Sequence, residues 1–194
     1  MSELKKEEII NGKIYAMSSG FSAHGWASSK LGDKFKEYFK LKRNFQCQVF
    51  VENLDLFLNE SNRKEYVTPD VMIMCDLSKL DKRGYRGVPE LVIEVLSYST
   101  RDRDLPGGDK FDLYERSGIK EYWICSYKEK SIAQYILVNG KYELKKTIIC
   151  LDDAEIDVLT EEEKSKYTSV IRSYVFDDLE IDLRDNIFYD RFNV

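Results

Sequence analysis

The stretch PELVIEVLSYSTRDRDLPGGDKFDLYERSGIKEYWIC, residues 89–125, decides the fold. Its pattern predicts a strand, a helix and a second strand. Residues 90–97 are short and rich in Leu, Val and Ile, as is typical of a buried strand, and residues 121–125 are similar in character. A carboxylate, Glu94, lies inside the first of these strands. Because an isolated buried charge is costly, Glu94 needs a partner.

The helix between these strands has recognisable start and stop signals. Pro106-Gly107-Gly108 breaks the chain, and Asp109 is expected to cap a helix that ends near Ser117. Gly118 then stands where a left-handed residue commonly terminates a helix. Lys110 lies in the first turn, which brings a cation to the beginning of this helix.

A second apolar strand, residues 71–75, precedes this segment and follows Asp70. Two strands joined by a polar loop are most simply an antiparallel hairpin. If Met74 lies opposite Glu90, then Asp70 lies opposite Glu94, and both side chains point to one face because side chains alternate with period two. Directly opposed residues have Cβ atoms about 5 Å apart.

Two carboxylates at that separation repel each other unless one is protonated or a cation lies between them. A divalent metal with oxygen ligands, such as Mg²⁺ or Mn²⁺, satisfies this requirement economically. A structural alternative stays open on the residues alone. Asp70 can cap a turn, Glu94 can form an ordinary ion pair with Lys110, and Lys110 can be a solvated helix residue.

The remaining elements follow from turn and periodicity signals. Asn-Gly dipeptides favour tight hairpin turns, and apolar residues at helical spacing indicate an amphipathic helix. A Thr and a Glu three residues later form a capping box. In the N-terminal half, these patterns predict a bent strand or strand pair over 7–17 around Asn11-Gly12, a helix over 24–40, a strand over 46–58 with a break at Glu52-Asn53, and a loop over 76–88. In the C-terminal half, they predict a hairpin of 131–138 and 141–149 around Asn139-Gly140, a short helix from Thr160 to about Tyr167, and an edge strand within 170–183.

Composition sets the broad class. The 194 residues are 43% hydrophobic, and 30 Lys and Arg face 35 Asp and Glu, for a net charge of −5. This indicates one folded domain spanning residues 1–194 and gives no global basic signal for nucleic acid. No apolar run approaches the roughly 20 residues of a membrane span, and the charged start is unlike a signal peptide.

The four cysteines, Cys47, Cys75, Cys125 and Cys150, have no metal-ligand spacing. Three of them fall in strand-like segments, so buried free thiols are expected. Free thiols fit a reducing cytoplasm.

Three blocks carry a family resemblance: YVTPDVMIMCD (66–76), PELVIEVLSYST (89–100) and DKFDLYERSGIKEYWIC (109–125). In this order they closely resemble the Uma-two family of inferred restriction endonucleases, which belongs to the PD-(D/E)XK nuclease superfamily. The opening EEIINGKIYAM (7–17) and the helix led by His24 resemble the N-terminal part of the family. The resemblance implies a mixed α/β fold in which a restriction-endonuclease-like mixed sheet is flanked by helices, with the C-terminal β-hairpin as an addition.

The resemblance also implies a site. Asp70 and Glu94 match the acidic residues of the first and second motifs and would hold Mg²⁺, with Mn²⁺ as a substitute, together with the backbone carbonyl of Val95. Lys110 matches the catalytic lysine that the family carries in the following helix. Glu8 resembles a recurrent acidic position that could add a ligand.

Two departures from the family pattern bear on that lysine. The superfamily places a lysine two residues after the second acid, and here that position is Leu96. The family aspartate precedes its lysine by about four positions, whereas Asp104 and Lys110 are six apart. Pro106-Gly107-Gly108 holds the extra length, which could move Lys110 away from the carboxylates.

The function that this resemblance implies is metal-dependent hydrolysis of phosphodiester bonds in DNA, by a homodimer on superfamily analogy. Arg101 and Arg103 are the nearest candidates for substrate contact, although charged loop residues usually face solvent. His24, the single histidine, is a candidate accessory residue, although a histidine at a helix start is more often structural. Two alternatives remain: a catalytically inactive nucleic-acid-binding or protein-interaction module, and a hydrolase for another phosphoester.

Overall fold

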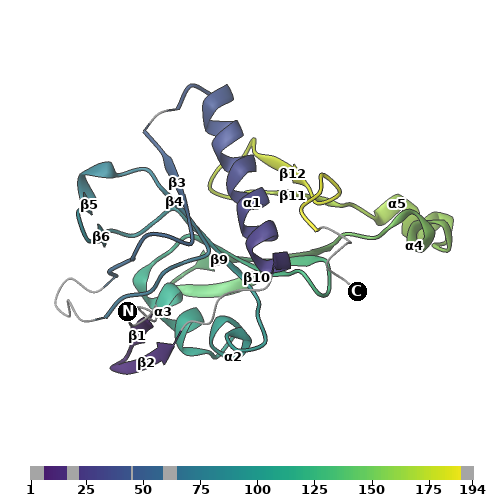
Figure 1. Cartoon of the computed structure of the whole chain (residues 1–194). Helices are drawn as coiled ribbons and strands as arrows, with labels where there is room; N and C mark the ends of the chain where they lie inside the picture. The colour runs from purple at the N-terminus through teal and green to yellow at the C-terminus, as the bar shows by residue number, and fades with distance from the viewer. Residues whose placement is uncertain (1–6, 17–21, 45, 59–64, 189–194) are drawn as a thin grey trace.

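A six-stranded mixed sheet forms the centre of the computed structural model, which describes residues 7–16, 22–44, 46–58 and 65–188 (Figure 1). The strand order is β10-β9-β8-β7-β4-β3. All neighbours are antiparallel except the pair β7 and β8, which run parallel because a helical crossover joins them. The six strands are β3 (Gln48–Val51), β4 (Val71–Met74), β7 (Leu91–Val95), β8 (Glu121–Ser126), β9 (Ser131–Val138) and β10 (Lys141–Ile149).

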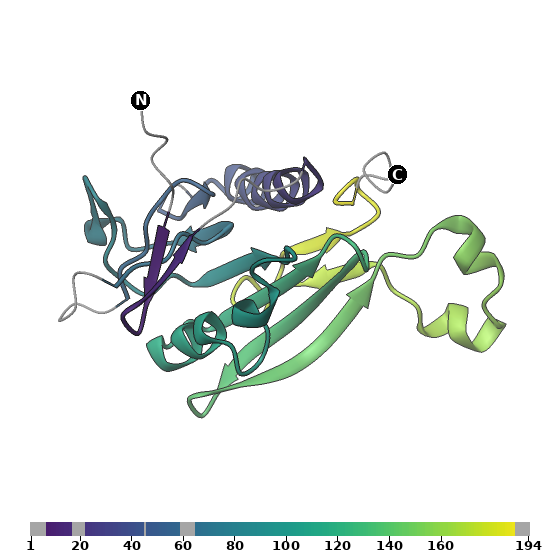
Figure 2. The ribbon, with the colours of Figure 1, turned by 60° about the horizontal axis from the view of Figure 1, so that its bottom comes forward.

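Helices cover the two faces of this sheet unequally. The long helix α1 (Ser22–Leu41) packs on one face, whereas α2 (Arg101–Asp104) and α3 (Asp109–Ser117) lie on the other (Figure 2). The apolar core is divided in the same way. Ile93 and Val95 of β7 pack with α1, while Val92 packs with the α3 side. Alternation along β7 therefore places Glu94 on the α3 face.

The predicted register between the first two apolar strands is confirmed. Val71 lies opposite Ile93 and Ile73 lies opposite Leu91. Extended beyond the start of β4, this register sets Asp70 opposite Glu94, on the face to which Met72 and Val92 already contribute. A slip of one residue would turn Glu94 into the α1 core, so burial of both faces fixes the pairing.

Both Asn-Gly hairpins are confirmed. β9 and β10 have the predicted bounds, and β1 (Glu7–Ile10) pairs with β2 (Lys13–Ala16). In each turn the Asn and the Gly have positive φ, at 52° and 76° in the first and 51° and 79° in the second. Those angles characterise the two-residue turn whose twist matches antiparallel strands.

Several local predictions need correction. Gly108, not Asp109, is the N-cap of α3, and the Asp109 carboxylate instead binds Lys13 and Tyr15 of the N-terminal hairpin. The C-terminal residues 170–183 do not extend the main sheet. They form a separate two-stranded sheet of β11 (Val170–Arg172) and β12 (Glu180–Asp182), which packs with α1.

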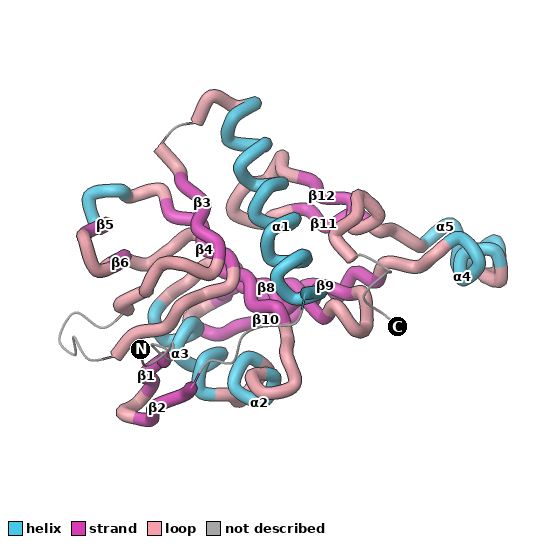
Figure 3. Tube along the Cα trace, viewed as in Figure 1, coloured by secondary structure: helices cyan, strands magenta, loops and turns pink. Residues whose placement is uncertain are grey.

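Short elements occupy two connections. The predicted loop between β4 and β7 contains a 3₁₀ turn, η1 (Leu77–Lys79), and the strand pair β5 (Leu80–Asp81) and β6 (Gly84–Tyr85), which lie beside the main sheet (Figure 3). Between β10 and β11 the chain forms α4 (Asp153–Asp157) and α5 (Glu161–Lys166), and the predicted capping box of α5 is present. These two helices bury no residue and project from the body (Figures 1 and 2).

The expectation of four free thiols is wrong for two cysteines. Cys47 and Cys75 form a disulfide, whereas Cys125 and Cys150 are free. Gln48 pairs with Met74 across β3 and β4, so the next position brings the two cysteines together although they are 28 residues apart in sequence. The disulfide weakens the argument for a reducing compartment. Within the described ranges, no helix is long and apolar enough to cross a membrane.

One buried carboxylate attaches the C-terminal sheet to the main sheet. Glu121 begins β8 and is fully buried. Its Oε1 accepts hydrogen bonds from Trp123 Nε1 and Gln134 Nε2, both at 2.6 Å. Its Oε2 accepts from Ser173 Oγ at 2.8 Å and from the backbone amides of residues 174 and 175 at 2.9 Å each. A buried carboxylate is stable where donors are this numerous.

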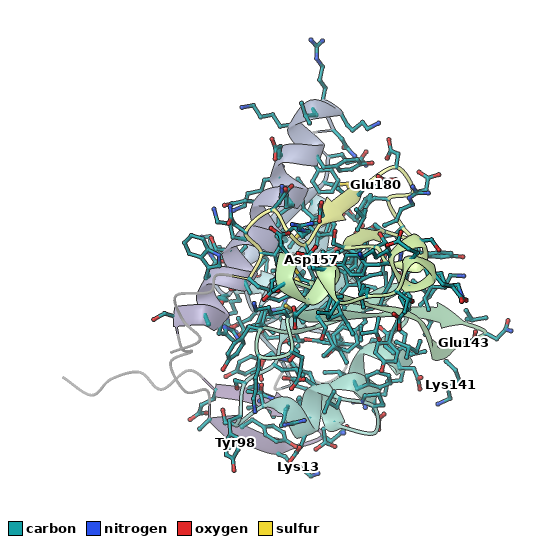
Figure 4. All side chains as sticks on the ribbon, turned by 90° about the vertical axis from the view of Figure 1, so that its right-hand side faces the viewer. Lys13, Tyr98, Lys141, Glu143, Asp157 and Glu180 are labelled. Carbon is teal, nitrogen blue, oxygen red and sulfur yellow. A yellow bond between two sulfur atoms is a disulfide. The ribbon has the colours of Figure 1, made fainter. Side chains whose placement is uncertain are left out.

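Replacing Glu121 with alanine should lower the free energy of unfolding by about 3 kcal/mol or more, because the donors around it would lose their acceptor inside the protein. Urea denaturation at neutral pH measures the change. Glu143, which projects from β10 (Figure 4), gives the matched control. We expect Glu143→Ala to change stability by less than about 0.5 kcal/mol, and equal losses in the two variants would contradict the anchoring role.

Candidate functional site

Charged side chains from four elements converge beneath the N-terminal hairpin. Glu8 comes from β1, Glu94 from β7, Asp104 from α2 and Lys110 from the first turn of α3. Each is no more than 2% exposed. Asp70, at the entrance to β4, is 7% exposed. Such burial of charge is unusual for a surface network and marks this place as a candidate site.

Lys110 lies at the middle of these contacts. Its Nζ is 2.9 Å from Glu94 Oε1 and 3.0 Å from Glu8 Oε1. The hydroxyl of Tyr114, one helical turn later, donates to the same Glu94 oxygen at 2.6 Å. The backbone amide of Thr68 donates to Glu8 at 2.8 Å. The lysine and Glu94 are therefore held by α3 and β7 together.

Asp70 connects this group to α1. Its Oδ2 accepts from the backbone amide of Val95 at 2.6 Å and lies 3.1 Å from His24 Nε2. The other ring nitrogen of His24, Nδ1, is 3.3 Å from Glu52 Oε1. Burial lowers the pKa of His24, but its interactions with the carboxylates of Asp70 and Glu52 outweigh burial and raise the pKa to about 10.

The site holds more negative than positive charge among the described residues. Four carboxylates, those of Glu8, Asp70, Glu94 and Asp104, surround the cations of Lys110 and Arg103. Burial raises the pKa of Glu94, Lys110 lowers it, and the other three carboxylates raise it further. Burial likewise raises the pKa of Asp104. Burial is the largest cause of both shifts, and neighbouring carboxylates add to it.

Lys110 has the opposite environment. Burial lowers its pKa, but the carboxylates of Glu8 and Glu94 outweigh that effect and raise it above the ordinary value. The ammonium is therefore charged at neutral pH. The side chain is a fixed point charge and hydrogen-bond donor, rather than a general base.

The two arginines expected near substrate occupy different environments. Arg101 is exposed at the start of α2. Arg103 is 8% exposed, with its Nη1 2.7 Å from Glu8 Oε2 and its Nε 3.6 Å from Asp104 Oδ1. Its guanidinium faces the site carboxylates, so Arg103 lies among them as an internal counter-ion.

Sequence reasoning did not include three residues of this region. Tyr114 lies four residues after Lys110, a spacing that puts both side chains on one helix face, and this signal was available. Asp104 was noted only for its spacing from Lys110; its Oδ1 is buried without a hydrogen bond among the described residues. Glu52 gave no local signal, because its position depends on the pairing of β3 with β4.

The extra residues before Lys110 are absorbed in a tight turn between α2 and α3. The amide of Gly108 donates to the Leu105 carbonyl at 2.9 Å, and α3 begins at the following residue. A Cβ on Gly108 would lie 2.3 Å from the Arg103 carbonyl oxygen and 2.4 Å from that of Asp102. This close approach of the two backbones leaves Lys110 within ion-pair distance of Glu94.

Gly108→Ala should therefore lower the free energy of unfolding by about 1–3 kcal/mol, because the methyl group would force backbone atoms of α2 and α3 apart. Urea denaturation measures the loss. Gly25→Ala in α1 is the control, since nothing lies within 4 Å of its added methyl group. Alanine there should be neutral or stabilising by up to about 1 kcal/mol. An unchanged Gly108→Ala variant would rule out the close packing of this turn.

Comparisons with known proteins identify the family and the fold. The Uma2 family, described as "Putative restriction endonuclease", matches residues 1–165. The chain belongs to the Uma2 family. A Synechocystis sp. (strain ATCC 27184 / PCC 6803 / Kazusa) protein, "Uncharacterized protein slr1290", is 32% identical over 132 residues, which make up 68% of this chain and 66% of that protein. The matched region thus spans just under two thirds of that relative.

A solved structure has the same fold. The crystal structure of a "putative nuclease" from Anabaena variabilis ATCC 29413 superposes with a TM-score of 0.65 and 16% identity, covering 100% of this chain and 94% of that one. At this identity the likeness establishes the fold alone. The restriction-endonuclease-like mixed α/β fold is thereby confirmed for the Uma2 chain described here.

The Uma2 site fits a divalent cation on chemical grounds. Its oxygen ligands are of the type that Mg²⁺ and Mn²⁺ prefer, and its carboxylates outnumber its fixed cations. The raised pKa of Glu94, which arises from burial and like charges, is what a cation would relieve. The register of β4 with β7, extended by one residue, sets Asp70 opposite Glu94, and Lys110 Nζ lies 2.9 Å from Glu94 Oε1.

Proposed function

We propose that the Uma2 chain is a metal-dependent endonuclease that hydrolyses phosphodiester bonds in DNA, with Asp70, Glu94 and Lys110 as its catalytic residues. The observation that carries this proposal is the 2.9 Å contact of Lys110 Nζ with Glu94 Oε1, next to Val95, whose amide donates to Asp70 Oδ2 at 2.6 Å. Two acids and a buried ammonium from three elements form a constellation suited to a phosphate ester and a cation.

Each residue has a distinct part in this proposal. Asp70, Glu94 and the Val95 carbonyl would hold Mg²⁺ or Mn²⁺, with Glu8 as a further carboxylate nearby. When bound, such an ion polarises a phosphodiester and lowers the pKa of coordinated water. Lys110 would donate hydrogen bonds to the oxygens on which negative charge develops. Tyr114 would keep Glu94 oriented through its hydroxyl.

A plasmid-nicking assay tests the proposal. Wild-type protein with Mg²⁺ or Mn²⁺ should convert supercoiled DNA to open-circular or linear DNA. Asp70→Ala and Glu94→Ala should reduce the rate by at least about 100-fold, while the exposed control Glu143→Ala should cut like the wild type. Metal-independent nicking, or equal nicking by all variants, would reject the assignment.

The same assay separates the two alternatives. Duplex DNA, single strands, RNA and small phosphoesters are supplied side by side. Hydrolysis of small phosphoesters alone would indicate another phosphoesterase. DNA binding without cleavage by the wild type would indicate an inactive binding module that retains the fold. Loss of cleavage with retained binding in Lys110→Ala would support the nuclease.

The proposal also covers the domain organisation and the oligomeric state of the enzyme. Residues 1–194 would act as one domain, because Glu121 hydrogen-bonds the C-terminal sheet to β8. The active form would be a homodimer, since two sites cut both strands of a duplex more readily than one. Sedimentation with and without DNA tests the dimer, and a monomer in both conditions would exclude it.

A further inference from the structure

A second group of ligating side chains lies on the α1 side of Asp70. His24 in the first turn of α1, Glu52 after β3, and Asp70 each offer one ligand atom, and the three atoms lie within 4.8 Å of one another. A shared ion at about 2.1 Å from each ligand needs ligand separations of roughly 3 to 4 Å. Small side-chain rotations would therefore close the group around an ion.

The backbone holds this group together. The amide of Glu52 donates to the Asp70 carbonyl at 3.0 Å, which fixes the two residues side by side. Ser28, one turn after His24, donates its hydroxyl to Glu52 Oε1. Hydrogen bonds of this kind orient metal ligands in proteins. His24 Nδ1 is buried and makes no hydrogen bond of good geometry, although Glu52 is 3.3 Å away.

Access distinguishes this group from the carboxylates around Lys110. The side chain of Glu52 is 40% exposed and that of His24 is 12% exposed, whereas those of Glu94 and Lys110 are 3% and 1% exposed. An ion from solvent can reach the Glu52 side directly. On the Lys110 side an ammonium group already occupies the position next to the carboxylate.

We propose that His24, Glu52 and Asp70 form a binding site for a first-row transition-metal ion of the Zn²⁺ or Mn²⁺ class. One imidazole and two carboxylates are a ligand set that such ions accept, and water would complete the coordination. The site has Asp70 in common with the proposed nuclease centre, but its metal binding does not depend on DNA cleavage.

The imidazole sets the metal preference. Mg²⁺ keeps most of its water and favours all-oxygen sites, whereas Zn²⁺ and other later ions bind imidazole well. The site should therefore select Zn²⁺ over Mg²⁺. An all-oxygen site of Asp70 and Glu94 alone would not place His24 in the coordination shell, so the state of the imidazole distinguishes the two arrangements.

The chain offers an unusually direct probe, because His24 is its single histidine. In a ¹⁵N-labelled sample of the full chain, one imidazole gives the histidine side-chain signals. One equivalent of Zn²⁺ should shift the ¹⁵N signal of a ring nitrogen, and a tenfold excess of Mg²⁺ should leave it in place. Unshifted ring signals at stoichiometric Zn²⁺ would overturn the proposal without any variant having to fold.

Variants test the second ligand. Glu52→Gln should raise the Zn²⁺ dissociation constant about tenfold or more, measured by titration calorimetry. Asp157→Asn, an exposed acid on α4 (Figure 4), is the matched control and should bind Zn²⁺ like the wild type. Equal constants for the two variants would overturn the proposal.

The nicking assay on the same samples keeps this inference separate from the nuclease. Zn²⁺ bound at His24 in a protein that never cuts DNA would reject only the proposed function. Mg²⁺-dependent cleavage, together with His24 ring signals that Zn²⁺ does not shift, would reject only the site of His24, Glu52 and Asp70.

Discussion

Lys110→Met should lower the free energy of unfolding by about 3–5 kcal/mol at pH 7 and abolish DNA cleavage. Methionine keeps most of the buried volume but removes the ammonium that contacts Glu8 and Glu94 at 3.0 and 2.9 Å. The carboxylates of Glu8 and Glu94 would then face each other without the ammonium between them. Asp70 and Asp104 nearby would lose the same cation. Removing one partner from a buried ionic group is costly because the remaining charge is uncompensated.

Urea denaturation and the nicking assay measure the two effects on one preparation. Lys141→Met is the control, because Lys141 is 79% exposed beside Glu115 on the outer edge of the sheet (Figure 4). Exposed ion pairs contribute little, so we expect a change below about 1 kcal/mol there. A Lys110→Met protein that cuts DNA at the wild-type rate would exclude the ammonium from the chemistry.

The parts of the fold that the sequence predicted correctly were those set by local rules. The Asn-Gly turns fixed both hairpins, because only residues that tolerate positive φ fit there. The pairing of β4 with β7 followed from alternation, since a shift of one residue would turn each side chain of the strand to the opposite face of the sheet. Alternation alone thus predicts that Asp70 and Glu94 share one face of the sheet.

The rest depended on contacts between distant residues. Glu8 reaches Lys110 across about one hundred positions, and Glu52 meets His24 only through the packing of α1 on β3. Arg103 has the sequence appearance of a solvated loop residue, but the carboxylates of Glu8 and Asp104 compensate its burial. The Cys47–Cys75 disulfide likewise follows from strand pairing and not from spacing.

Glu94→Gln should abolish metal-supported cleavage while leaving the metal-free protein within about 1 kcal/mol of the wild type, or more stable. The amide oxygen can still accept from Lys110 and from Tyr114, so both hydrogen bonds at Glu94 Oε1 survive. The substitution removes the negative charge of the Glu94 carboxylate. Burial raises the pKa of that carboxyl group, Lys110 lowers it, and the neighbouring acids raise it further. This variant therefore separates a site with surplus negative charge from an ordinary ion pair, in which losing either partner would be similarly harmful.

The pH dependence of folding stability tests the same point, because the direction of the change can be predicted. With its folded pKa above the unfolded value of about 4.3, Glu94 favours folding when it is protonated. Its contribution to stability is fully present below pH 4.3 and is lost as the pH rises through the folded pKa. The stability of Glu94→Gln relative to the wild type should consequently increase from pH 4 to pH 7, measured by urea denaturation without metal.

Combining the two substitutions completes the argument. In Lys110→Met/Glu94→Gln the buried cation and one of its carboxylates are removed together, so the loss should be smaller than that of Lys110→Met alone. Ordinary additivity would instead give the double variant a loss equal to the sum of the two single changes, so coupling is shown by a double variant that is more stable than that sum. A double variant that recovers none of the lost free energy would mean that Glu94 is not the carboxylate that Lys110 neutralises, and the proposed catalytic pair would have to be abandoned.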